Sequence, residues 1–264
     1  MKFRIGSLLT AAAVTAALSF GAAHAEGIKV GANIGNVPWE FEDASGKIVG
    51  FEVDLMTEVG KRLGKEVTFE NIPFQGLFPA VQSGRIDAAV SSITITQKRL
   101  ASVSFAQPYY DSDQSLTVMA DSGIKSMDDM KGKIVAVDTG STGDMWATEN
   151  QAKYGIAEIK RFEGLAPAML DVEAGRVNGY ISDIPALLYY VKDKPQFQVV
   201  ERILTGEQYS VMFNKDAPLA AEVNEVLTAL KSEGFIAGLH EKWFGAKAED
   251  STSTVKVLDV PKLQ

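Results

Sequence analysis

Short apolar runs alternate with helical patterns between residues 28 and 90, and this alternation limits the fold more than any other feature of the sequence. The predicted elements are strands at 28–32, 67–69 and 87–90, with helices at 53–64 and 74–84. Strands joined through helices at this spacing form right-handed crossovers, which make the sheet parallel. Ligands of such sheets bind at the carboxyl ends of the strands, where Asn33, Phe74 and residues 91–94 fall.

A second unit of the same kind follows after Pro108 breaks the rhythm. The predicted elements of this unit are strands at 133–138, 159–162 and 177–181, with helices at 139–154 and 166–174. Two extended passes, near 115–119 and 207–213, connect the units, and a long amphipathic helix begins after Pro218. A last helix reaches Phe244 before a polar tail. The pattern leaves open one continuous doubly wound sheet or two lobes with a hinge.

The first 25 residues have the pattern of a secretory signal peptide. Lys2 and Arg4 form its charged start, residues 8–20 form an apolar segment too short to span a bilayer, and an A-x-A site predicts cleavage after Ala25. The chain has no cysteine, which excludes a disulfide, a thiol nucleophile and a lipid-anchored cysteine. We therefore expect a soluble protein of the periplasm.

The net charge of the chain indicates which classes of binding partner to expect. The formal net charge is −8, and it becomes more negative when Lys2 and Arg4 leave with the signal peptide. An acidic surface argues against nucleic acid and against an anionic membrane as partners. We expect a monomer.

The stretch from Ser91 to Arg99, SSITITQKR, combines the groups that bind an anion. An apolar approach ends in a cluster of hydroxyls, and Thr96 is a candidate N-cap for a short helical start. Free backbone N–H groups, small hydroxyls and the guanidinium of Arg99 would together hold a carboxylate. The alternative is a strand, a turn and a surface arginine beside Lys98.

This stretch resembles the carboxylate-binding segment of the periplasmic polar amino-acid binding proteins, the solute receptors of ABC importers. The resemblance extends from about Ile28 to Phe244. It implies an α/β fold of two lobes, each with a parallel-core sheet, joined by a two-pass hinge. The implied divisions are a signal peptide at 1–25, a first lobe at 26–114 and 208–250, a second lobe at 115–207 and a tail at 251–264.

The resemblance also implies a ligand site for a free L-amino acid. Arg99 would bind the carboxylate in two parallel bonds, and Ser91, Ser92 and Thr94 would add hydroxyl and backbone bonds. Thr142 would donate to the same carboxylate from the second lobe, and Asp183 would pair with the ammonium. As alternatives, Thr142 could simply cap the helix it begins, and Asp183 could cap the helix that Pro185 begins.

Three further positions would surround the ligand side chain. The resemblance places Phe74 against the aliphatic stem, although a phenylalanine at a helix start can equally be core. Asn33 stands where several relatives carry an aspartate, and Asn36 where the family usually has an aromatic residue. Two neutral amides suit a neutral polar side chain better than a basic one, unless Glu40 or Asp144 turns inward. Whether Trp39 or Glu40 faces the cleft stays open.

The sequence gives little support for an enzymatic function. His240 is the one histidine after residue 25, so neither a catalytic triad nor a histidine metal site can be built, and we expect it at the surface. Residues 139–143 lack the lysine and spacing of a phosphate loop, and we expect no cofactor. The predicted function is capture of a polar amino acid and its delivery to an ABC permease. The alternatives are a cyclohexadienyl dehydratase of the same fold and, less favoured because no membrane segment follows Phe244, a receptor sensor lobe.

Overall fold

The structure is a computed structural model that describes residues 27–264, so the predicted signal peptide lies outside the described residues. The first lobe is built on a sheet of order β4-β1-β5-β12-β6. Its strands are β1 (Ile28–Ala32), β4 (Val67–Asn71), β5 (Ala88–Ala89), β6 (Val103–Phe105) and β12 (Met212–Asn214). Its helices are α1 (Phe51–Leu63), α2 (Phe74–Gln82), α3 (Gln97–Leu100), α7 (Pro218–Ser232) and α8 (Phe235–Phe244). The sequence patterns missed a small hairpin, β2 (Phe41–Glu42) with β3 (Ile48–Val49).

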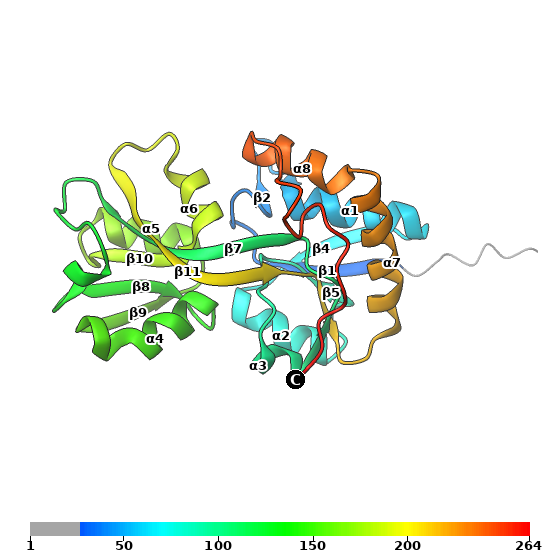
Figure 1. Ribbon diagram of the computed structural model, residues 1–264, viewed down its shortest axis with the longest axis horizontal. Helices are drawn as coiled ribbons and strands as arrows, with labels where there is room; N and C mark the ends of the chain where they lie inside the picture. Colours follow the sequence, from blue (N-terminus) through cyan, green and yellow to red (C-terminus); the bar gives the residue numbers. More distant parts are fainter. Residues whose placement is uncertain (1–26) are drawn as a thin grey trace, which may run out of the picture.

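The second lobe is built on a sheet of order β11-β7-β10-β8-β9. Its strands are β7 (Tyr110–Met119), β8 (Ile134–Asp138), β9 (Glu158–Phe162), β10 (Gly179–Asp183) and β11 (Phe197–Tyr209). Its helices are the 3-10 turn η1 (Met127–Met130), α4 (Thr142–Tyr154), α5 (Leu165–Glu173) and α6 (Ile184–Val191). The two sheets lie in separate bodies side by side (Figure 1), which decides against one continuous sheet.

Both sheets have the predicted parallel core. In the first lobe β1 pairs in parallel with β4 and β5, and in the second lobe β8 pairs in parallel with β9 and β10. The strands that enter or leave the hinge, β7 and β12, pair antiparallel with their neighbours. The parallel strands are joined through helices, so their carboxyl ends in each lobe share one edge of the sheet.

The hinge is formed by β7 and β11, which pair antiparallel from Met119 and Phe197 to Tyr110 and Tyr209 and run between the lobes (Figure 1). The predicted lobe divisions at 114/115 and 207/208 fall inside these strands. The chain returns to the first lobe within the expected pass near 207–213, but the strand that leads there, β11, is longer than expected and begins at Phe197. Two register shifts interrupt the ladder of β11, so the alternation that marks a strand is broken in its sequence.

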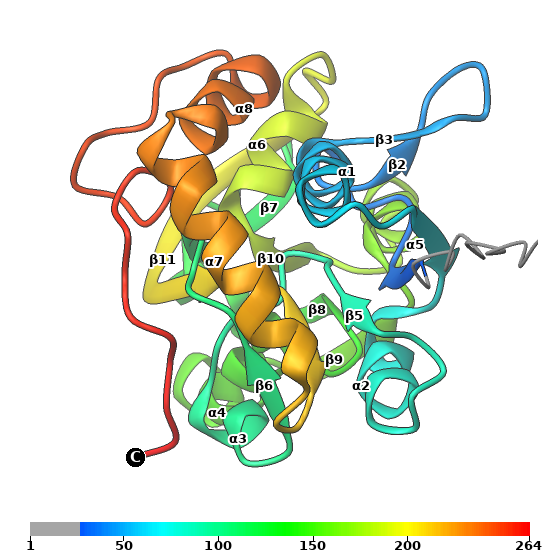
Figure 2. The same cartoon turned by 90° about the vertical axis from the view of Figure 1, so that its right-hand side faces the viewer.

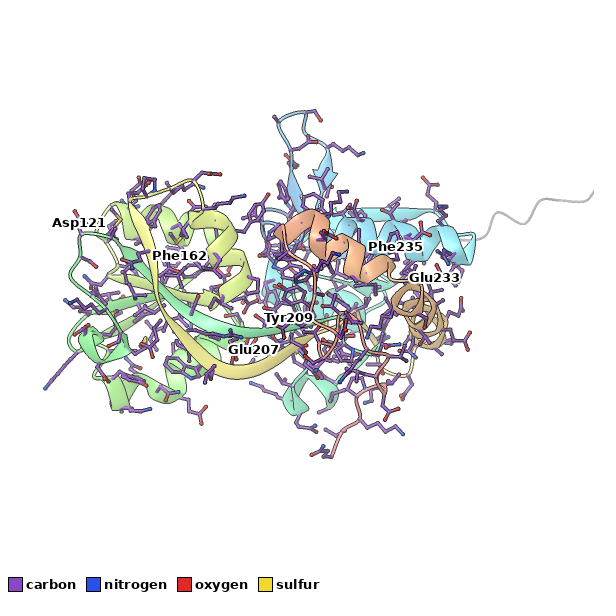
Figure 3. The ribbon with its side chains drawn as sticks, turned by 45° about the horizontal axis from the view of Figure 1, so that its top comes forward. Asp121, Phe162, Glu207, Tyr209, Glu233 and Phe235 are labelled. Carbon is purple, nitrogen blue, oxygen red and sulfur yellow. The ribbon has the colours of Figure 1, made fainter. Side chains whose placement is uncertain are left out.

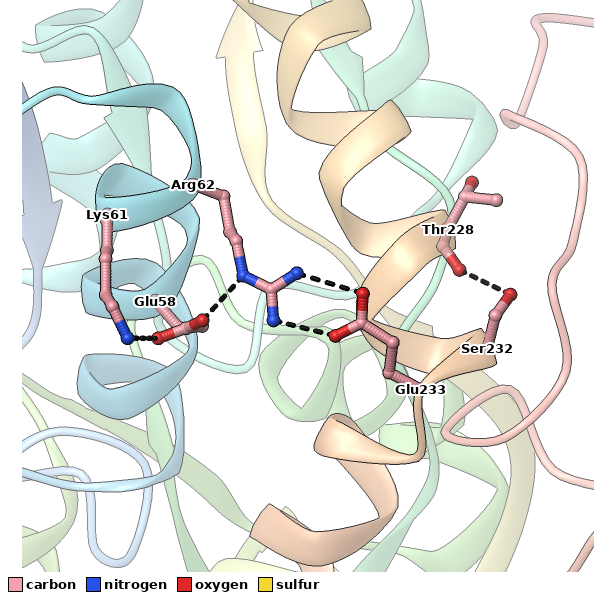
Figure 4. A network of polar contacts seen from close by, with 6 residues as sticks. All are labelled: Glu58, Lys61, Arg62, Thr228, Ser232 and Glu233. Atoms are coloured by element: carbon pink, nitrogen blue, oxygen red, sulfur yellow. Dashed lines mark hydrogen bonds and ion pairs between the residues drawn. The ribbon is translucent and has the colours of Figure 1, made fainter.

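Helices α7 and α8 return the chain to the first lobe and pack on α1 (Figure 2). Arg62 of α1 donates to Glu58 and, in a fork, to both carboxylate oxygens of Glu233 at the end of α7 (Figure 4). The core beneath contains Trp39, which is fully buried. The carboxyl-terminal helices therefore pack on elements of the first lobe.

The tail after α8 runs along the outside of the first lobe towards α3 (Figure 2). The Ser253 hydroxyl donates to Asp111 at the start of β7, at 2.7 Å. The buried ammonium of Lys231 donates to the carbonyl oxygen of Lys256 at 2.8 Å, and Gln264 donates to Gln97 of α3. The tail therefore joins the hinge to the helix that carries Arg99. Among residues 27–264, no helix is long and apolar enough to cross a membrane.

Candidate functional site

A pocket lies where the carboxyl ends of the parallel strands of both lobes face each other. Eight of the nine residues predicted as ligand-binding line this pocket, from both lobes. The lining residues are Asn33, Asn36, Phe74, Ser91, Ser92, Thr94, Asp138, Ser141, Thr142, Leu165, Ser182 and Asp183. The ninth predicted residue, Arg99, lies beside the pocket rather than in its lining.

Ser92 is held in the left-handed region, with φ of 44°, just after β5. Its backbone N–H donates to the carboxylate of Glu52 on α1 at 2.9 Å, and Glu52 also accepts from the Tyr109 hydroxyl. This turn aims the Ser92 hydroxyl across the pocket at Asp183, 3.1 Å away. Glu52 was not predicted to take part, because nothing local distinguishes it from the other acids of an amphipathic helix.

Arg99 is buried, with 4% of its surface exposed, so the alternative of a surface arginine is wrong. Thr96 caps the short helix by accepting from the Arg99 N–H at 3.1 Å, as predicted. The guanidinium donates to the carbonyl oxygens of Thr94 at 2.7 Å and Gly140 at 3.3 Å. It also lies over the rings of Phe74 and Phe78, 5.3 and 5.1 Å from their centroids.

Burial lowers the pKa of Arg99 to about 10, although the carboxylates of Glu207 and Asp183 act in the opposite direction. The guanidinium still carries its charge at neutral pH. It therefore remains the charged donor expected of a carboxylate site, but its present bonds run to backbone carbonyls of both lobes.

Thr142 does not cap α4. Ser141 holds that position and accepts from the Asp144 N–H at 3.0 Å. The Thr142 hydroxyl instead donates to Glu207 at 2.9 Å and lies 3.4 Å from the hydroxyl of Thr94 in the other lobe. The capping alternative for Thr142 is therefore wrong.

Asp183 stands at the N-cap position of α6, but its side chain makes no capping bond. Its carboxylate accepts from Ser92 and from the amide of Gln114, the latter at 2.6 Å. Burial, together with the charge of Glu207, raises the pKa of Asp183 to about 7. The carboxylate is thus aimed into the pocket and lacks a cationic hydrogen-bond partner among the described residues.

Glu207 and Gln114 belong to the site although the sequence analysis did not name them. Glu207, on β11, accepts from Thr94 at 2.6 Å, Thr142 at 2.9 Å and Gln114 at 2.9 Å. Figure 3 shows Glu207 near Tyr209, where β11 passes between the lobes. The sequence placed residue 207 in a pass between the lobes, but nothing local indicated that its side chain would accept from Thr94 and Thr142.

At the other end of the pocket, Phe74 is half-buried and Asn36 donates to Ser92 at 3.2 Å. Glu40 lies behind this end, where it accepts from Asn36 at 3.3 Å and from Ser91 at 2.6 Å. Burial and the nearby charge of Glu52 raise the pKa of Glu40. Asp138, at the end of β8, lines the pocket and was missed by the sequence analysis.

Three other residues considered from the sequence do not line the pocket. Trp39 packs against Tyr110 and Tyr209 in the core, with ring centroids 4.7 and 5.4 Å away. Asp144 forms an ion pair with Arg161 at 2.8 Å. His240 is half-buried at the surface, where it stacks on Tyr110.

The lobes are closed on each other. The pairs that bridge them include Ser92 with Asp183, Thr94 with Thr142 and Glu207, Arg99 with Gly140, and Gln75 with Glu163. The arrangement places a buried cation, several hydroxyls and a buried carboxylate around one small space. Such a site can bind a molecule that has both an anionic and a cationic group.

Relatives of known role have the same architecture. The histidine-binding periplasmic protein of Escherichia coli K12 is 33% identical over 254 residues, which cover 92% of this chain and 97% of the relative. The arginine-, lysine- and histidine-binding protein ArtJ of Geobacillus stearothermophilus superposes with a TM-score of 0.79 at 33% identity, over 85% of this chain and 97% of that one. A mutant of ArgBP from T. maritima superposes with a TM-score of 0.78 at 36% identity, over 83% and 95% of the two chains.

The sequence pattern of one protein family matches residues 28–246, from β1 to just beyond α8. That span contains both lobes, the hinge and every residue of the pocket. The chain therefore belongs to the bacterial extracellular solute-binding proteins, family 3.

Proposed function

We propose that this protein captures a free polar L-amino acid between its lobes and delivers it to the permease of an ABC importer. The observation that carries the proposal is that Asp183 of the second lobe lines the pocket while the buried guanidinium of Arg99, from the first lobe, lies beside it. An amino acid carries the two complementary charges. The relatives of this chain include arginine-, histidine- and cystine-binding proteins, which supports this ligand class.

In the proposed complex the ligand takes over bonds that the closed lobes now make to each other. The carboxylate accepts from Arg99 and from the hydroxyls of Thr94 and Thr142, which now donate to Glu207. The ammonium donates to Asp183, which now accepts from Ser92. Because these groups come from both lobes, only the closed form makes all of them, and closure is favoured by the difference in binding energy.

We propose the lobe limits expected from the sequence, 26–114 with 208–250 and 115–207, as the bodies that move. The hinge would bend within β7 and β11, near the register shifts of β11. The proposal places the mature protein in the periplasm after cleavage behind Ala25, as a monomer that binds its ligand without chemical change.

A thermal-shift screen of the twenty amino acids tests the proposal. We expect at least one polar L-amino acid to raise the melting temperature, because a ligand that binds only the folded state stabilises it. The N-acetyl derivative and the carboxamide of that amino acid are the controls, since each removes one of the two charges. If every free amino acid leaves the melting temperature unchanged, or if both derivatives bind equally well, the proposed function is wrong.

A further inference from the structure

Asp138 is the acid of the pocket whose carboxylate is incompletely bonded. Its Oδ2 atom accepts from the Tyr180 hydroxyl at 2.7 Å. Its Oδ1 atom is buried and has no hydrogen-bond partner among the described residues. The N–H of Gly164 lies near this carboxyl group without reaching hydrogen-bond geometry. Burial raises the pKa of Asp138 to about 6, which is the usual effect of removing a carboxylate from water without a cationic partner.

The other acids near the pocket are accounted for. Asp183 is the proposed partner of the ligand ammonium, and Glu207 accepts from three donors. Glu40 also has one oxygen without a donor, but it does not line the pocket, and burial with the nearby charge of Glu52 raises its pKa. Asp138 alone among these acids both lines the pocket and has a buried oxygen without a hydrogen-bond donor among the described residues.

The sheet register places Asp138 and Asp183 on opposite faces of the second-lobe sheet. Tyr180 pairs with Ala136 in adjacent parallel strands, so Asp138 falls beside Ser182, one residue before Asp183. Side chains alternate along a strand. Asp138 therefore shares the face of Tyr180 and Ala136, which α5 covers, and Asp183 shares the opposite face, which α4 covers.

This placement gives the ligand a direction. A molecule with its ammonium at Asp183 and its carboxylate at Arg99 lies over the edge of the sheet near α4. Its side chain then extends across that edge towards α5, where Asp138, Leu165 and Asn33 line the pocket. An apolar stem would pass Phe74 and Leu165, and the tip would meet the unpaired oxygen of Asp138.

We infer that Asp138 is the specificity-determining residue of the pocket, and that the ligand is an L-amino acid whose side chain ends in a cation. The inference rests on the proposed function and deepens it. It reverses the preference for neutral polar ligands that Asn33 and Asn36 suggest, because an unpaired buried carboxylate favours a cation over a neutral amide. Either amide can still accept from a second N–H of the cationic tip.

Calorimetry with arginine and citrulline tests the inference on the unaltered protein. Citrulline has nearly the same length and shape as arginine, but its urea tip is neutral. We expect arginine to bind at least about tenfold more tightly than citrulline, because only arginine offers Asp138 a charge-assisted bond. Lysine and glutamine extend the comparison to a second cationic and a second neutral side chain. Glutamine or citrulline binding as tightly as arginine and lysine would overturn the inference.

Two variants separate charge recognition from general damage to the pocket. Asp138→Asn keeps the shape of the side chain and should abolish the preference for arginine over citrulline, while citrulline binding and the melting temperature change little. Asp128→Asn removes an exposed acid of η1 in the same lobe and should leave the preference intact. An Asp138→Asn protein that still prefers arginine to the original extent would show that another group selects the side chain.

The outcomes also distinguish this inference from the proposed function. If neutral amino acids bind best through intact ammonium and carboxylate groups, only the inference fails. If no free amino acid binds the unaltered protein, the proposed function fails and the inference falls with it.

Discussion

The hydroxyl of Ser92, in the first lobe, donates to the carboxylate of Asp183, in the second lobe, at 3.1 Å. The same Ser92 is fixed from behind by its N–H bond to Glu52. A rigid donor in one lobe thus meets an acid of the other lobe that has a raised pKa. In the closed form Asp183 and Glu207 lie near the buried guanidinium of Arg99. A ligand ammonium would offset the excess of negative charge among these described residues.

The first prediction concerns lobe closure. In the closed, ligand-free form Asp183 lies buried near the charge of Glu207 and has no cationic hydrogen-bond partner among the described residues. We expect the free protein to populate a more open form and the ligand to close it. Small-angle X-ray scattering should therefore show a smaller radius of gyration at saturating ligand. An identical scattering profile with and without ligand would contradict hinge closure.

The second prediction concerns Arg99. Arg99→Ala should weaken ligand binding by about 30-fold to several thousand-fold, because loss of one partner of a buried charge pair costs about 2–5 kcal/mol. Lys98→Ala, which removes the adjacent exposed cation, is the matched control and should bind normally. Isothermal titration calorimetry measures both. Equal affinities for the two variants would show that the carboxylate binds elsewhere.

The third prediction concerns pH. Burial raises the pKa of Asp183 to about 7, so the closed, ligand-free pocket favours the protonated acid. This contribution to stability is complete below the ordinary aspartate pKa of about 3.9 and is lost as the pH rises through about 7. The ligand ammonium has the opposite preference, because it pairs with the ionised form. Affinity should therefore rise between about pH 5 and about pH 8, with proton release on binding.

The fourth prediction tests the source of that shift. The charge of Glu207 contributes to the raised pKa of Asp183, after burial itself. Glu207→Gln should move the midpoint of the affinity profile to lower pH, while the amide keeps a hydrogen-bonding group near Thr94 and Thr142. Asp183→Asn should flatten this part of the profile. Calorimetry across pH measures both, and an unshifted midpoint in Glu207→Gln would assign the raised pKa to burial alone.

The fifth prediction concerns the tail. Ser253 is buried and its hydroxyl bonds to Asp111 at the start of the hinge strand β7. Ser253→Ala should lower the free energy of unfolding by about 1 kcal/mol, the usual net contribution of one such bond. Ser251→Ala, at an exposed position of the same tail, is the control and should be neutral. Denaturant titration compares them. Equal stabilities would indicate that the tail is not held through Ser253.

Local patterns were sufficient for much of the fold. The helical period from Val53 to Leu63, the Thr96 cap and the glycine after α1 each act within a few residues of the chain, so their outcome is readable from sequence. The long strand β11 was not readable, because two register shifts break its alternation and its pairing with β7 is a tertiary event. The small hairpin of β2 and β3 was also too short for a period to appear.

For the site, the sequence by itself determined the chemical types that gather at the strand ends: hydroxyls at 91–94, the arginine at 99 and the acid at 183. Only the tertiary structure decided which groups meet. Thr94 and Glu207 are 113 residues apart, and no periodic pattern relates them. Burial likewise decided that Glu40 lies behind Ser91, that Trp39 belongs to the core, and that Asp138 lines the pocket with one oxygen unpaired. Desolvation and charge pairing depend on the whole packed environment of a side chain, and that environment exists only in the folded chain.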